Sequence, residues 1–155
     1  MKTIHFILII ALPIFSINTA YSQVEENRNE KLVRGFLKSI QTPNWNFDTL
    51  SNRYILFRSD ESPQFSKTER KVIISFALTY LSMELNTVKF DELIIRPYLK
   101  ADSSLQKMFL DEETKRKSVI AYSKDKLFKR YFLLEDGKII SFVTFQQGKV
   151  FMLLN

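Results

Sequence analysis

Any acid–base chemistry in this chain has to come from carboxylates, tyrosines, lysines or arginines. The 155 residues include no cysteine and one histidine, His5, which lies in an N-terminal segment that we expect to be removed. A mature chain without imidazole or thiol excludes disulfides, thiol nucleophiles, imidazole-based triads and cysteine-rich zinc sites. We therefore expect neither a metal nor a cofactor, and no residue is assigned a catalytic role.

One candidate pair lies on a predicted helix. Tyr80 and Glu84 are four residues apart and therefore share a helix face. A carboxylate beside an apolar cavity would have a raised pKa, as a general acid or base requires. The alternative is that Glu84 reaches solvent from the last turn of the helix, because glutamate is seldom fully buried.

A second candidate group lies on one face of a predicted sheet, where it could form the polar mouth of an apolar pocket. Its members are Tyr122, Lys129, Tyr131 and Thr144. The alternative is that the tyrosines are ordinary core residues with their hydroxyls at the rim. Arg130 falls on the opposite face, where it either binds an anionic group or extends along the sheet edge.

A net charge of +6 and a basic run at 115–117 are compatible with an anionic partner. Lys124, Lys126 and Lys129 follow, with aromatic neighbours, and this composition suits nucleic acid or an anionic glycan. A solvated hairpin end is the alternative. Because the chain contains no nucleic-acid-binding motif, we expect no specific nucleic acid partner; a small apolar or anionic ligand is the open alternative.

The first 22 residues have the three parts of a secretory signal peptide. Lys2 gives a positive start, residues 4–17 are largely apolar, and Ala20 and Ser22 place small residues at positions −3 and −1 of a cleavage site. The apolar run of about 14 residues is shorter than the roughly 20 that span a bilayer, and a retained N-terminal anchor is the alternative. We expect cleavage before Gln23, export to the periplasm or the cell exterior, and no stable membrane anchor.

The remaining chain, 23–155, is predicted to be a single α+β domain that begins with helices. Residues 24–41 carry an apolar stripe at helical spacing. A capping box of Ser66 and Glu69 opens a longer helix over 66–85. Because this second helix is apolar nearly all round, we expect it to be the central helix, buried on more than one side.

Shorter elements complete the predicted order. We expect one or two helical turns at 47–52, a β-like run at 54–57, a loop at 59–66, a strand at 90–99 with Pro97 at an edge or bulge, and a short helix within 103–113.

From residue 118 the apolar residues alternate with period two, and Asp136-Gly137 and Gln147-Gly148 are turn signals. Glu135 and Lys138 would face each other across the first of these turns. The pattern predicts a curved, mostly antiparallel sheet that ends in a four-stranded meander over 118–124, 127–135, 138–146 and 149–154.

Neither face of this meander is polar, so both faces must be covered. We expect the helix at 66–85 on one face and a second subunit, in a homodimer, on the other. The alternative cover is the N-terminal helix or the 103–113 segment.

Two stretches of the chain match the pattern of a known family. Phe36-Leu37 is followed by 46–50 (NFDTL), and residues 130–140 read RYFLLEDGKII. The first stretch resembles the junction of the first two helices of the nuclear transport factor 2-like (SnoaL-like) cone superfamily, and the second resembles its penultimate hairpin. The resemblance implies a cone-like sheet that wraps a helix, a pocket at its mouth and dimers through the convex face. The acid–base pair of the isomerase members has no counterpart here, so no catalytic residue is carried over.

Two functions are compatible with these observations. The first is a non-catalytic ligand-binding or protein-interaction module of the cell envelope. The second is a pocket enzyme, of isomerase or hydrolase type, that uses carboxylate and tyrosine. A cavity containing a buried, unpaired Asp or Glu would favour the enzyme, whereas an interior filled by Phe and Leu would favour the binding module.

Overall fold

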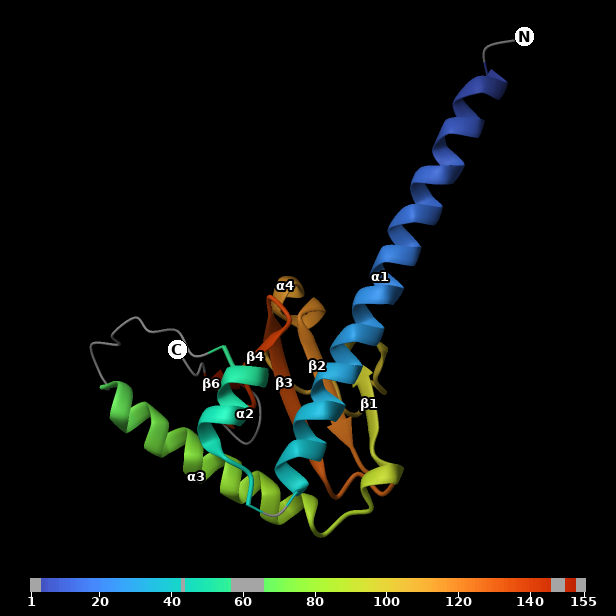
Figure 1. Ribbon diagram of the computed structural model, residues 1–155. Helices are drawn as coiled ribbons and strands as arrows, with labels where there is room; N and C mark the ends of the chain where they lie inside the picture. Colours follow the sequence, from blue (N-terminus) through green and yellow to red (C-terminus); the bar gives the residue numbers. More distant parts are fainter. Residues whose placement is uncertain (1–3, 43, 57–65, 146–149, 153–155) are drawn as a thin grey trace.

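The computed structural model describes residues 4–42, 44–56, 66–145 and 150–152. Helices precede a four-stranded antiparallel sheet that does not close into a barrel (Figure 1), which confirms the predicted α+β class. The helices are α1 (Ile4–Gln41), α2 (Phe47–Tyr54), α3 (Lys67–Leu85) and α4 (Glu112–Arg116). The sheet contains β1 (Ile94–Pro97), β2 (Ser118–Tyr122), β3 (Lys129–Glu135) and β4 (Lys138–Ser141) in that order, while β5 (Val143–Phe145) pairs only with β6 (Val150–Met152).

The central helix is α1, and not α3 as predicted. Val33, Phe36, Leu37 and Ile40 of α1 are fully buried, and they belong to the same core as Phe132 of β3. Figure 1 shows the C-terminal part of α1 lying along the sheet, with α3 at the outside of the molecule. The prediction failed because an apolar composition all round a helix does not say how many of its faces a small domain can cover.

The second face of the sheet is covered by the chain itself. Tyr98, Leu105 and Met108 lie in one cluster with Ile120 and Tyr131 of this face. The main-chain N–H of Met108 donates to the Tyr98 hydroxyl at 3.1 Å, which fixes the covering segment. This face is therefore covered without a second subunit, and the oligomeric state stays a prediction.

The prediction of a short helix within 103–113 is wrong. Residues 103–111 are irregular, with Leu105 and Met108 buried because they cover the sheet. The helix α4 begins later, where the carboxylate of Asp111 accepts the N–H of Thr114 at 2.7 Å. Hydrogen bonding of this kind at the N-cap lowers the pKa of Asp111.

Several predicted strands are shorter or belong elsewhere. The strand expected at 90–99 is reduced to β1, which lies at a sheet edge with Pro97 as its last residue, as an imino acid requires. The strand expected at 138–146 is broken at Phe142, after a register shift between Leu133 and Leu134. As a result, the strand expected at 149–154 pairs with β5 and does not join the sheet; β1 is the fourth strand instead.

The hairpin between β3 and β4 confirms its turn signal. Asp136 and Gly137 have φ angles of 50° and 70°, as a type I′ turn requires, and Glu135 lies opposite Lys138. The Lys138 ammonium donates to the carbonyls of Asn52 and Arg53, both at 2.7 Å, and so ties the hairpin to α2. The turn expected at Gln147-Gly148 and most of the loop expected at 59–66 lie outside the described residues.

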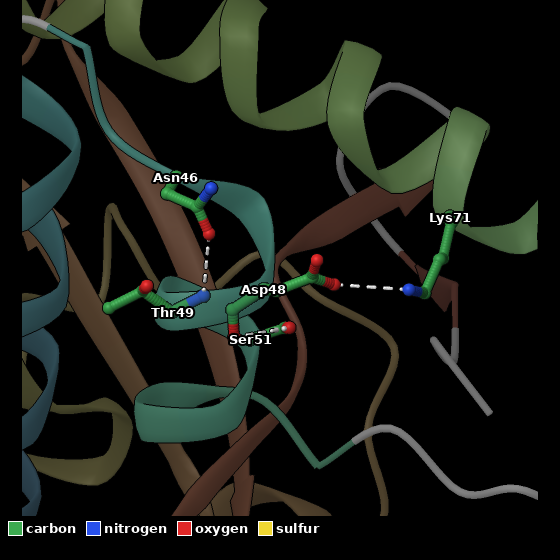
Figure 2. A network of polar contacts seen from close by, with 5 residues as sticks. All are labelled: Asn46, Asp48, Thr49, Ser51 and Lys71. Atoms are coloured by element: carbon green, nitrogen blue, oxygen red, sulfur yellow. Dashed lines mark hydrogen bonds and ion pairs between the residues drawn. The ribbon is translucent and has the colours of Figure 1, made fainter.

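An ion pair joins α3 to α2, which has polar contacts of its own (Figure 2). The Asn46 side chain caps α2 by accepting the N–H of Thr49 at 3.0 Å, and the Ser51 hydroxyl donates to the Asp48 carbonyl at 3.2 Å. The Asp48 carboxylate then forms an ion pair with Lys71 of α3 at 3.0 Å. At the start of α3, the predicted capping box of Ser66 and Glu69 is present.

Candidate functional site

An ion pair between Arg130 of β3 and Glu84 of α3 links the sheet to the outer helix. Both side chains are about 70% removed from solvent, with exposures of 30% and 27%. The guanidinium carbon of Arg130 also lies 5.9 Å from the centroid of the Tyr80 ring. One arginine therefore contacts both a carboxylate and an aromatic ring, an arrangement that a planar guanidinium forms readily.

Two cavities meet at Arg130. One, of about 390 Å³, lies between α3 and β5, and we call it the Arg130 groove; its lining residues are Phe76, Ala77, Tyr80, Leu81, Arg130, Phe142, Val143 and Thr144. The other, of about 300 Å³, lies on the far side of the ion pair, where Glu84 and Arg130 meet the turn before β3. The walls of the groove are mainly apolar, with a few polar groups, as in sites that receive an apolar side chain or ligand.

Two of the residues predicted from sequence line the groove, and a third is joined to it through Arg130. Tyr80, 61% exposed, and Thr144 line the groove, while Glu84 lines the second cavity and forms the ion pair with Arg130. Thr144 was expected on the other sheet face, with Tyr131. The break in the strand at Phe142 removes the strict alternation on which that expectation rested, and it places Thr144 beside Arg130.

The other three predicted residues lie apart from the groove. Tyr131 is buried and donates from its hydroxyl to the Leu105 carbonyl at 2.7 Å, while Tyr122 is almost fully buried in the same cluster. Burial, with a smaller effect of Tyr98, raises the pKa of Tyr131 to about 12. The Lys129 ammonium lies 5.9 Å from the centroid of the Tyr131 ring. The predicted polar mouth is thus not assembled, because residues 98–110 cover this face.

Sequence reasoning missed the outer face of α3. Large apolar side chains follow one another along it, with exposures of 50% for Val72, 72% for Phe76, 61% for Tyr80 and 64% for Met83. We call these four residues the α3 stripe. The apolar pattern of residues 66–85 predicts a helix buried on more than one side and does not set these four residues apart. Their intervals of four, four and three residues, on the side opposite the buried Leu78, were the signal that could have identified a separate face.

A third cavity, larger than these two, lies elsewhere, between residues 25–29 of α1, the helix α4 and the β3–β4 turn. Its volume is about 760 Å³, and its charged lining residues are Glu25, Glu26, Lys100, Lys115, Arg116, Lys117, Glu135 and Asp136. Lys100 is paired with Glu26, Lys115 with Glu112 and Lys117 with Glu113. The basic run at 115–117 is therefore largely neutralised by carboxylates, which disfavours a polyanionic partner here.

The described residues contain no group of three or more metal-ligating side chains that could hold a metal ion. No described helix is both long enough and apolar enough to cross a bilayer.

Comparison of the chain with family models, curated proteins and solved structures gives no match.

Proposed function

We propose that this protein is an exported, non-catalytic interaction module that binds a protein partner through the α3 stripe and the adjacent Arg130 groove. Export is inferred from the signal-peptide pattern of the first 22 residues. The observation that carries the interaction is the α3 stripe, four large apolar side chains that are at least half exposed on one helix face. Contiguous apolar patches of this kind on a soluble domain mark interaction sites.

The residue types at this site are those that dominate binding energy at protein interfaces. Tyrosine, phenylalanine, methionine and arginine are enriched there, and energetic hot spots centre on side chains that fill pockets. Phe76, Tyr80 and Arg130 all line the groove. An apolar anchor from a partner could enter the groove and contact both the ring of Tyr80 and the guanidinium.

The interior of the domain supports binding over acid–base catalysis. The ring of Phe36 lies 6.0 Å from that of Phe132 and 5.7 Å from that of Phe142, so aromatic side chains fill the space between α1 and the sheet. Glu84, the carboxylate that an enzyme would use, is committed to Arg130. From the resemblance to the nuclear transport factor 2-like superfamily we also propose a cone-like architecture. In this proposal the filled interior is the scaffold for the interaction face.

Site-specific photo-crosslinking in cells tests the proposal. A benzophenone amino acid at position 80 should yield a protein adduct, and the same group at position 109 is the matched control. Phe109 is as exposed as the stripe, at 69%, but lies on the segment that covers the opposite sheet face. Equal adducts at both positions, or none at position 80, would contradict an interaction face on α3.

A further inference from the structure

The α3 stripe is spaced to pack on a copy of itself. Phe76 and Tyr80 are placed symmetrically about Leu78, and Val72 and Met83 are placed almost symmetrically about the same point. In an antiparallel pair of helices related by a two-fold axis near Leu78, Phe76 of one copy meets Tyr80 of the other. Val72 of one copy then meets Met83 of the other, which is the reciprocity that an isologous interface requires.

Charge does not oppose this packing. Residues 72–83 contain no charged side chain, and the exposed neighbours of the stripe include the small hydroxyl residue Thr79. The bounding charges are each paired within their own chain, Lys71 with Asp48 and Glu84 with Arg130. Homodimer interfaces are depleted in charge and enriched in aromatic residues and methionine in the same way.

The exposed apolar surface of the α3 stripe is the size expected for a weak, reversible dimer. An aromatic side chain carries ~200 Å² of surface, so Phe76 and Tyr80, at 72% and 61% exposure, contribute on the order of 270 Å² per copy. Val72 and Met83 extend this apolar centre, and the edges of the Arg130 groove supply a rim. A standard interface takes about 800 Å² from each partner, so the α3 face lies at the small end of specific interfaces.

We propose that the partner bound by the α3 stripe is a second copy of this chain, docked antiparallel. Phe76 of each copy then lies against Tyr80 at the mouth of the other copy's Arg130 groove, so that each copy completes the other's site. This inference rests on the proposed function and names its partner. It relocates the homodimer expected from sequence from a sheet face to the outer helix.

Sedimentation equilibrium of the purified protein measures the association. Phe76→Lys should weaken dimerisation at least tenfold. It should leave the melting temperature unchanged at concentrations where the wild type is monomeric, because Phe76 is 72% exposed and contributes little to the core. Phe109→Lys, an equally exposed change outside α3, should leave the dimer intact. A wild-type protein that is monomeric at high micromolar concentration, or a dimer that tolerates Phe76→Lys, would overturn the inference.

Single cysteines report the orientation, because the chain has no cysteine of its own. Thr79→Cys lies beside the two-fold axis and should form an intermolecular disulfide on mild oxidation. Val72→Cys should not, because six residues from the axis place the two copies of this position ~18 Å apart along antiparallel helices. Disulfides at both positions would indicate a parallel pair and reject the antiparallel arrangement.

The two proposals fail in different ways. If the wild type is monomeric but position 80 still crosslinks to another protein in cells, the α3 stripe is an interaction face and only the identity of its partner is wrong. If position 80 gives no adduct and the protein is monomeric, both proposals are wrong.

Discussion

Two tyrosines that the sequence placed in candidate sites have opposite environments. Tyr80 is largely exposed beside Arg130, whereas Tyr131 is 4% exposed and donates its hydroxyl to the Leu105 carbonyl. An i,i+4 spacing was enough to predict that Tyr80 and Glu84 share a helix face. The environment of Tyr131 depends on residues 98–110. Because these residues have no regular periodicity, the sequence offers the 103–113 segment only as an alternative cover for the sheet.

The buried Tyr131 should make the protein sensitive to alkali. Its pKa is raised from 10.0 to about 12 by burial, so the unfolded chain loses this proton before the folded one. The stabilisation is complete below pH 10 and is lost as the pH rises from 10 to 12, by up to about 2–3 kcal/mol. Urea unfolding of the wild type across this range measures the loss.

Tyr131→Phe isolates the contribution of this group. The variant should be about 1 kcal/mol less stable at pH 7, because the buried Leu105 carbonyl loses its donor. It should also lose less stability than the wild type between pH 10 and 12. Parallel profiles for the two proteins would show that Tyr131 does not titrate as described.

At the scale of elements, features set by residues close together in the sequence were predicted correctly. Features that depend on pairing between distant residues were not. The capping box at Ser66 and the turn at Asp136-Gly137 are set by residues a few positions apart, and both are confirmed. The break at Phe142 accompanies a register shift between β3 and β4, which two-residue periodicity does not encode. Because of this break, Thr144 lines the Arg130 groove and does not lie on the sheet face of Tyr131.

The capping box gives a direct test of how α3 is held. The Ser66 hydroxyl accepts the N–H of Glu69 at 3.3 Å, and the Glu69 carboxylate accepts the Ser66 N–H at 2.8 Å and its hydroxyl at 2.7 Å. Ser66→Ala should therefore cost about 1 kcal/mol of unfolding free energy. Thr68→Ala, an exposed position in the same turn, is the control and should change stability by less.

The same contacts lower the pKa of Glu69, the hydroxyl of Ser66 having the largest effect. A lowered folded-state pKa stabilises the protein above the unfolded value and loses that contribution as the pH falls through the folded value. The difference between Ser66→Ala and the wild type should accordingly shrink in acid. A difference that stays constant from pH 7 to pH 2 would mean that the carboxylate takes no part in the cap.

At the scale of the whole molecule, the signal-peptide pattern predicts that the first 22 residues are removed before the protein functions. N-terminal sequencing of protein recovered from the cell envelope or medium should begin at Gln23, the residue after Ala20-Tyr21-Ser22. Ser22→Lys, which places a large charged residue at position −1, should block processing, while Gln23→Ala should not. Recovery of the intact wild-type chain beginning at Met1 would contradict cleavage.

Both edges of the four-stranded sheet are protected against pairing with another chain. On one side, the N–H of Leu56 donates to the Ile139 carbonyl at 3.0 Å, so Ile55 and Leu56 cover the outer edge of β4. On the other, β1 has only four residues and ends at Pro97, which has no N–H to offer. Intermolecular strand addition, the usual start of amyloid-like aggregation, is thereby discouraged at this sheet. Association through side chains on a helix, as proposed for the α3 stripe, would therefore leave the main chain of this sheet closed to fibril formation.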